Sequence, residues 1–218
     1  MAYVLGFIFA DGTIEDVRKS SRTCYTQLSN NDKSLLIDIK NVLSSNHIIY
    51  KRKSRWIIFF GKKYLSSKSY HLRIGSKSIY NDLKNLGLTP RKSLIMKLPI
   101  IPNNLFHYFL RGYFDGDGCI NLYNRRYKNN DNKHKELKTI LTSGSYMFLT
   151  QLSKKLHLLL GIPRNTVFRN SGAYRLSFRI RSSLKILSYM YKNLKKAPYL
   201  KRKYCIYLNY VKTSNVSV

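Results

Sequence analysis

The chain has 218 residues, and its 40 Lys and Arg against 10 Asp and Glu give a formal net charge of +30. With 44% hydrophobic and 13% aromatic residues, it does not belong to the class of disordered basic tails, and its length is sufficient for a buried core. The positive surplus is spread between apolar residues along the whole chain, which excludes a single localisation cluster and predicts a polyanionic partner, nucleic acid first.

The first half of the chain predicts a helix, two strands, a helix, two strands and a final helix. Its apolar and alternating segments predict a helix over Val4–Ala10, strands around Thr13–Lys19 and Thr23–Leu28, a helical pattern from Leu35 to Leu43, and strands around Ile48–Phe60 and Tyr70–Ile74. Two prolines follow in the segment Leu98–Asn104, and Asn103 or Asn104 can start the next helix. We therefore expect one repeat over residues 1–98, a linker over 99–104 and a second repeat over 105–218.

The second half predicts the same order of elements. Its helical pattern runs from Phe148 to Leu156, and its strands are expected near Cys119–Tyr127, Leu137–Thr142, Thr166–Asn170 and Tyr174–Arg181, with an exposed loop at Lys128–His134. The last of these strands alternates strictly between two kinds of side chain. One face carries Leu176, Phe178 and Ile180, and the other carries Arg175, Ser177, Arg179 and Arg181. This alternation predicts one face packed on helices and one cationic face.

The chain is an internal repeat. Two segments read alike, Val4-Leu5-Gly6-Phe7-Ile8-Phe9-Ala10-Asp11-Gly12 and Leu110-Arg111-Gly112-Tyr113-Phe114-Asp115-Gly116-Asp117-Gly118. Further matches follow in the same order, Tyr70–Ile74 with Tyr174–Phe178 and Arg91-Lys92-Ser93 with Arg202-Lys203-Tyr204. We predict an α+β fold built as a pseudo-two-fold tandem of αββαββα units.

Small residues recur at helical spacing within both repeated segments. Gly6 and Ala10 are four residues apart, as are Gly112 and Gly116. A stripe of small residues lets two helix backbones approach closely, so the two motif helices are expected to pack against each other at the pseudo-two-fold axis. A glycine after each acid is typical of a helix C-terminus.

The acids Asp11 and Asp117 are expected at the C-terminal ends of these helices, where the helix dipole disfavours a carboxylate. A turn would explain one Asp-Gly pair, but not two at matching positions. A bound divalent cation explains both, because carboxylates and free carbonyls are oxygen ligands. Metal ions beside a surface for a polyanion indicate phosphodiester hydrolysis.

The doubled motif resembles that of LAGLIDADG homing endonucleases, in their single-chain form with two motifs, and the likeness runs over nearly the whole chain. The resemblance implies two saddle-shaped antiparallel sheets lying in the DNA major groove, with the two motif helices packed at the centre. It also implies Mg²⁺-dependent cutting of both strands across the minor groove of a long asymmetric target, roughly 20 base pairs, with 3′ overhangs.

The resemblance carries roles to individual residues. Two or three Mg²⁺ ions would be shared between Asp11 and Asp117, and the backbone carbonyls of Ala10 and Gly116 would complete the metal shell. Polar residues that orient water would be Asn30 and Ser143, and basic residues near the scissile phosphates would be Lys92 and Lys203. This chain departs from the pattern at Phe9, which replaces a common acid that Asp115 keeps, and at Ser143, which is shorter than the usual Gln.

Candidate DNA-contacting residues lie on the outward positions of the strands. They are Arg175, Ser177, Arg179, Arg181, Asn121, Tyr123, Arg125, His71 and Arg73. Arg pairs with guanine and Asn with adenine when they read bases, and each Arg is equally consistent with a phosphate contact.

Two other roles stay open from the sequence. One is an RNA maturase that assists splicing of its host intron, with intron RNA as partner, and the other is a sequence-specific DNA-binding protein without catalysis. Both acids are present, which favours the nuclease. The early first motif argues against an intein-embedded form. We expect a monomer with double-stranded DNA as its partner, no membrane association, and a reducing intracellular compartment, either bacterial or archaeal cytoplasm or an organelle.

Overall fold

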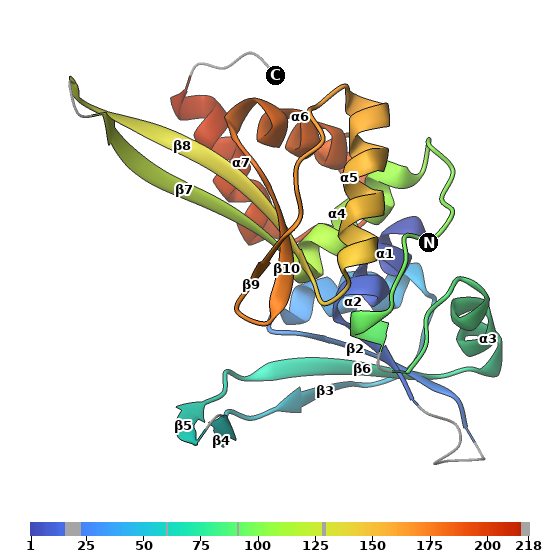
Figure 1. Cartoon of the computed structure of the whole chain (residues 1–218). Coiled ribbons are helices and arrows are strands. Elements are labelled where there is room, and N and C mark those ends of the chain that lie inside the picture. The colour runs from blue at the N-terminus through green and yellow to red at the C-terminus, as the bar shows by residue number, and fades with distance from the viewer. Residues whose placement is uncertain (16–22, 60, 91, 128–129, 215–218) are drawn as a thin grey trace.

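Two four-stranded antiparallel sheets, one from each half of the chain, carry helices packed against them in this computed structural model (Figure 1). The structure describes residues 1–15, 23–59, 61–90, 92–127 and 130–214. The first sheet has the order β1-β2-β6-β3, and the second β7-β8-β10-β9. Their strands are β1 Gly12–Ile14, β2 Tyr25–Asn30, β3 Ile49–Arg52, β6 Ser69–Gly75, β7 Gly118–Tyr127, β8 Asn130–Ser143, β9 Phe168–Asn170 and β10 Ala173–Phe178.

The helices follow the repeat as well, with one extra helix at the C-terminus. They are α1 Ala2–Asp11, α2 Lys33–Val42, α3 Lys77–Asn85, α4 Phe106–Asp117, α5 Tyr146–Leu160, α6 Ile180–Tyr191 and α7 Lys201–Thr213, with single 3-10 turns at Lys92–Leu94 (η2) and Leu194–Lys196 (η3). A small two-stranded ribbon, β4 Trp56–Phe59 with β5 Lys62–Leu65, extends from the first sheet. The α+β repeat is confirmed, whereas the division at residues 99–104 stays a prediction.

The pairing registers show that the two sheets are built alike. In each half, the glycine after the motif acid pairs with a leucine of the next strand, and that leucine pairs with another in the third strand of the sheet. The two rows are Gly12, Leu28 and Leu72, and Gly118, Leu141 and Leu176. Two positions after the middle leucine, Asn30 and Ser143 end their strands, so they occupy equivalent places.

The helices α1 and α4 pack backbone to backbone. A Cβ on Gly6 would overlap the carbonyl oxygen of Phe109, and a Cβ on Gly112 would overlap the carbonyl oxygen of Tyr3. These two contacts are related by the repeat, which places the pseudo-two-fold axis between the helices. Buried aromatic side chains surround the contact, for example Phe7, Phe9, Phe109 and Tyr113. The small residues therefore set the close approach of the two motifs.

Three predicted segments are wrong in detail. The strand expected around Ile48–Phe60 is interrupted at residues 53–55 and forms two strands, β3 and β4, while the part of the strand expected around Thr13–Lys19 that follows residue 15 lies outside the described residues. The strand expected to reach Arg181 ends at Phe178, because Arg179 is already the N-cap residue of α6. The Ser183 hydroxyl donates to the Phe178 carbonyl at 2.8 Å and accepts the Thr139 N–H, which ends the ladder. The loop expected over 128–134 is strand β8 from residue 130 onward, and residues 128–129 lie outside the described part.

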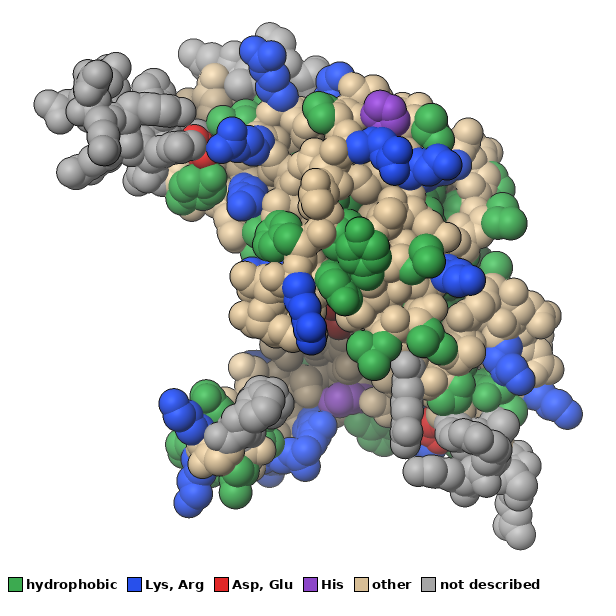
Figure 2. All heavy atoms as spheres, viewed as in Figure 1, with side chains coloured by type: hydrophobic (Ala, Val, Ile, Leu, Met, Phe, Trp, Pro, Cys, Tyr) green, Lys and Arg blue, Asp and Glu red, His purple; other side chains and the backbone are tan. Residues whose placement is uncertain are grey.

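Basic side chains are spread over the visible surface rather than gathered in one patch (Figure 2). No helix within the described ranges is long and apolar enough to cross a membrane. The charge pattern along the sequence thus becomes a distributed positive surface over both halves.

Candidate active site

The carboxylates of Asp11 and Asp117 meet where α1 and α4 end. A Cβ built on Gly116 would lie 3.3 Å from Oδ2 of Asp11 and would overlap Cβ of Ala10. Only small residues at Ala10 and Gly116 therefore allow the two helix ends to meet, and the Asp11 side chain reaches across the interface. The two acids therefore lie close enough for the Asp11 carboxylate to act on the pKa of Asp117.

Burial perturbs both acids, and repulsion from Asp11 also perturbs Asp117. Desolvation and the neighbouring Asp11 carboxylate together raise the pKa of Asp117 to about 6, against the attraction of Lys92 and Lys203. Burial also raises the pKa of Asp11, which Lys203, Lys92 and a hydrogen bond from Asn30 oppose. Two carboxylates held together away from water are favoured in ionised form only when additional positive charge is present.

The two predicted lysines supply part of that charge. Lys203, on α7, is buried, and its Nζ donates to the carbonyls of Phe114, Asp115 and Gly118 at 2.5, 3.0 and 2.6 Å. Burial lowers the pKa of Lys203 to about 8.

In the first half, Lys92 of η2 is buried as well, and its Nζ donates to the carbonyl of Ala10 at 3.1 Å. Burial lowers its pKa, while Asp117 and Asp11 oppose that shift. Both lysines therefore stand against the C-terminal turns of the motif helices, where free carbonyls attract cations.

The equivalent residues Asn30 and Ser143 have different surroundings. Asn30 hydrogen-bonds the Asp11 carboxyl directly. Ser143 instead contacts the hydroxyl of Tyr113, which donates to the Thr142 carbonyl at 2.6 Å. The site thus has one amide beside its first acid and a phenol–serine pair beside its second. The sequence assigns no role in the site to Tyr113, although its difference from Phe7 at the equivalent position of the first repeat is visible in the sequence.

A divalent cation suits this donor set. Among the residues that the structure describes, no three His, Cys, Asp or Glu side chains are grouped to hold a metal. Two half-buried carboxylates with raised pKa and nearby backbone carbonyls are nevertheless hard oxygen ligands, and the two lysines supply only part of the positive charge that they need. The Ala10 carbonyl already accepts Lys92, so a metal ion there would share it with the ammonium group or displace that group.

Most of the residues predicted to contact bases lie on the sheet faces opposite the buried leucines. In the first sheet, His71 and Arg73 alternate with the buried Leu72. The Arg73 guanidinium forms a bidentate ion pair with Glu15, at 2.9 Å for both hydrogen bonds, and its carbon lies 3.6 Å from the centre of the Tyr25 ring. His71 lies within hydrogen-bonding distance of Gln27 and Ser69.

In the second sheet, the outward positions hold Asn121 and Tyr123 on β7 and Arg175 and Ser177 on β10. The Tyr123 hydroxyl donates to Glu136 at 2.7 Å. The side chain of Arg125 lies outside the described part.

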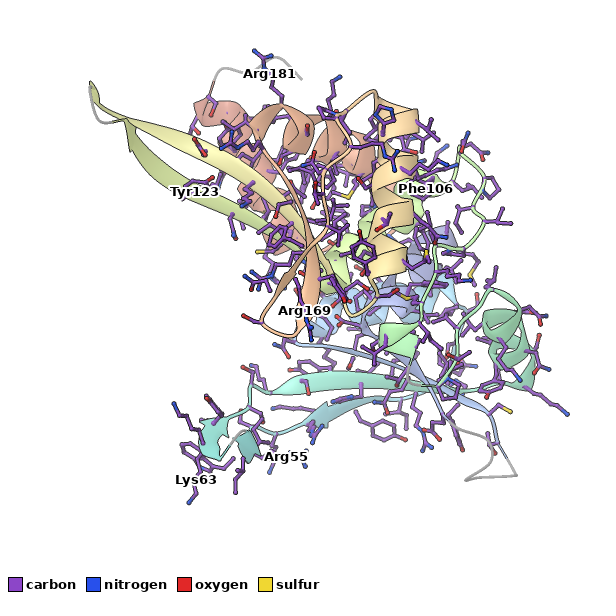
Figure 3. All side chains as sticks on the ribbon, viewed as in Figure 1. Arg55, Lys63, Phe106, Tyr123, Arg169 and Arg181 are labelled. Atoms are coloured by element: carbon purple, nitrogen blue, oxygen red, sulfur yellow. The ribbon has the colours of Figure 1, made fainter. Side chains whose placement is uncertain are left out.

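Arg179 and Arg181 do not share the strand face. Both are exposed, but Arg179 caps α6 and Arg181 lies in its first turn. Figure 3 shows Arg181 at the end of the molecule away from the first sheet. The alternation that suggested a base contact for these two residues does not exist, because the strand has already ended.

A further buried contact joins the motif to α7. The Asp115 carboxylate accepts the Tyr3 hydroxyl at 2.7 Å and the Leu200 N–H at 2.9 Å. Leu200 is the N-cap residue of α7, the helix that carries Lys203. Asp115 therefore ties the start of this helix to both motif helices, a role that its position beside Asp117 did not reveal.

Comparison with known proteins finds a family with a similar sequence and structures with a similar fold. Residues 110–214 match the model of the LAGLIDADG endonuclease family. A structure of I-SmaMI bound to uncleaved DNA target in the presence of calcium ions has a TM-score of 0.61 and 15% identity, over 97% of this chain and 89% of that one. The meganuclease I-AabMI bound to uncleaved DNA has a TM-score of 0.54 and 16% identity, over 91% and 84% of the two chains. The homing endonuclease I-LtrWI bound to target DNA has a TM-score of 0.55 and 15% identity, with the same coverage.

One curated relative also matches. A probable translation initiation factor IF-2 of Methanocaldococcus jannaschii is 31% identical over 132 residues. The match covers 57% of this chain but only 9% of that protein. It therefore relates this chain to a small part of a much longer polypeptide.

Proposed function

We propose that this chain, a two-motif member of the LAGLIDADG endonuclease family by its fold and its match over residues 110–214, is a site-specific nuclease that cuts both strands of a long DNA duplex. The observation that carries the proposal is the meeting of Asp11 and Asp117 between two lysines at the junction of two basic sheets. A non-catalytic DNA-binding protein would not need two half-buried carboxylates beside a polyanion.

DNA would lie along the outward faces of the two sheets, with the carboxylates facing the minor groove at the centre of the target. Lys and Arg side chains neutralise phosphates, so the logarithm of the affinity should fall with the logarithm of salt concentration, with a slope of about −0.9 per contacted phosphate. The pseudo-two-fold repeat supplies both half-sites in one chain, which supports a monomer acting on an asymmetric site, about 20 base pairs long, with staggered 3′ ends.

Bound Mg²⁺ would activate water and stabilise the charge of the leaving 3′ oxygen. The oxygens of Asp11 and Asp117 would hold the ions, together with the carbonyls of Ala10 and Gly116. The close helix contact at Gly6 and Gly112 fixes the spacing of these donors, and hence the spacing of the two cuts. Lys92 and Lys203 hold positive charge beside the scissile phosphates, and Asn30 orients the Asp11 carboxyl.

The decisive experiment is cleavage of a randomised duplex library with Mg²⁺ and with EDTA, followed by sequencing of the ends. Metal-dependent paired cuts at one asymmetric site are expected. Asp11→Asn and Asp117→Asn should each lower the rate of double-strand cutting at least a hundredfold while duplex affinity stays within a fewfold, and Asp38→Asn on the exposed face of α2 should change neither. If either motif variant linearises the target at the native rate, the assignment of the acids is wrong. If only intron RNA is bound, the maturase alternative replaces the nuclease.

A further inference from the structure

The ribbon β4–β5 is unusual because its apolar side chains are exposed. Trp56 is 69% exposed, Ile58 73% and Leu65 59%. The register pairs Trp56 with Leu65 and Ile58 with Lys63. Residues directly opposite each other point to the same side of an antiparallel pair, so these four side chains share one face of the ribbon. A contiguous exposed apolar face of this kind marks a binding surface.

The ribbon is also strongly basic. Arg55, Lys62 and Lys63 are exposed on it, and Arg55 and Lys63 are labelled in Figure 3. No Asp or Glu occurs between Asp38 and Asp82, a segment that holds the whole ribbon and its stem. In Figure 2 the ribbon forms a separate lobe on which basic and hydrophobic side chains alternate. This positive charge argues against a partner without acidic groups, such as a lipid acyl chain or a protein surface that lacks acidic residues. It favours a polyanion.

The ribbon continues the sheet that would hold DNA. Strands β3 and β4 follow each other along one arm, and β5 and β6 along the other. At the junction, Ser66 N–H donates to the Arg55 carbonyl at 2.9 Å, and the Ser66 hydroxyl accepts the Arg55 N–H at 3.1 Å. The two arms therefore stay paired beyond the sheet, so the orientation of the ribbon is set by the sheet.

The distance along the strand between the ribbon and the paired acids gives the position of the ribbon on DNA. Leu72 lies in the row of Gly12, directly after Asp11, and Leu65 lies seven residues earlier in the chain. At about 3.3 Å per strand residue, this is at most about 23 Å, or roughly seven base pairs of 3.4 Å each. A two-stranded ribbon enters the major groove, where the thymine methyl group is the apolar feature of the base edges.

We propose that the apolar face formed by Trp56, Ile58 and Leu65 reads thymine methyl groups in an A·T-rich segment roughly five to seven base pairs from the centre of the target, on the side of the first repeat. The basic side chains of the ribbon hold the adjacent phosphates. This inference rests on the proposed function and adds a specificity-determining element to it.

The test replaces thymidine by deoxyuridine, which removes only the methyl group. On the target selected from the duplex library, with binding measured in EDTA, each replacement in the predicted segment should weaken binding about fourfold, which corresponds to about 0.8 kcal/mol per buried methyl. The same replacement at the centre should have little effect. Because Trp56 is the only tryptophan of the chain, its fluorescence reports ribbon contact directly.

Two variants complete the test. Ile58→Ser and Leu65→Ser should weaken binding to the thymidine duplex and remove most of the sensitivity to deoxyuridine, whereas Ile100→Ser, at a residue 97% exposed in the connection, should leave both unchanged. The proposal is overturned if deoxyuridine has no effect in this segment, if the ribbon variants weaken both duplexes equally, or if Trp56 fluorescence is unchanged in the complex. These results would leave sequence-specific cutting intact. Absence of any sequence-specific duplex binding would instead overturn the proposed function, and this inference with it.

Discussion

Replacing Asp117 by Asn is expected to stabilise the metal-free protein while it abolishes cutting. The pKa of Asp117 is about 6 in the folded chain, against 3.8 as the ordinary value. Stability from this carboxyl is fully present below pH 3.8, falls as the pH rises through 6, and is absent at pH 7.5. The difference of about two pKa units corresponds to roughly 3 kcal/mol, which partial exposure reduces to about 1–3 kcal/mol. The raised pKa of Asp117 already includes the attraction of Lys92 and Lys203. The ionised carboxylate therefore still destabilises the folded chain, and a neutral side chain removes this destabilisation.

The assay is thermal unfolding in EDTA at pH 7.5 and at pH 4.5. At about 2–4 °C per kcal/mol for a chain of this size, Asp117→Asn should raise the midpoint by roughly 2–12 °C at pH 7.5 and by much less at pH 4.5. Asp38→Asn, in the exposed part of α2, is the control at both pH values. Mg²⁺ should raise the midpoint of the native chain but not that of the variant. A lower midpoint at pH 7.5, or an equal gain at both pH values, would refute the reasoning.

Four more substitutions probe the structure around the acids. Gly112→Ala places a Cβ on the Tyr3 carbonyl and should cost about 3 kcal/mol in urea unfolding; an unchanged midpoint would contradict the backbone contact. Lys203→Met and Lys92→Met should both suppress plasmid cutting, but Lys203→Met should destabilise the fold more, because it leaves three carbonyls without their donor rather than one. Tyr3→Phe removes one of two donors to the Asp115 carboxylate, whose pKa is about 6, and should lower the free energy of unfolding by about 1–3 kcal/mol at pH 8 and by less at pH 5. Tyr50→Phe, at a residue that is 58% exposed, is the control. An equal loss at both pH values would show that the hydroxyl does not stabilise the ionised acid.

The doubled motif, the pairing of its acids and the equivalence of Asn30 with Ser143 could be predicted because the information is local. Small residues at a spacing of four define a helix stripe, and alternating strands define a face. A repeat then supplies the second copy of each feature in the same order. The register of the two sheets confirms the alignment of Tyr70–Ile74 with Tyr174–Phe178, which depended only on matching letters.

What could not be predicted depends on contacts between distant segments. The strand through Arg181 is interrupted because Ser183, one turn into the next helix, takes the Phe178 carbonyl. The ion pair of Arg73 with Glu15 and the bond of Tyr3 to Asp115 join residues far apart in the sequence. No periodicity encodes such partners, so the sequence identifies Arg73 only as an outward strand position and assigns no role to Glu15 or Tyr3.

The two halves are alike at the acids and differ directly behind them. Behind Asp117, the Asp115 carboxylate anchors α7, and this helix brings Lys203 to three carbonyls. Behind Asp11, the equivalent position is Phe9, whose ring packs against aromatic neighbours, and Lys92 comes from a single 3-10 turn. A dimer of identical chains could not build such different supports for its two acids. A single chain can, and an asymmetric duplex presents a different half-site to each support. Both halves keep an Asp at the motif position because each DNA strand requires the same hydrolysis. The surrounding residues can differ because each half contacts a different half-site.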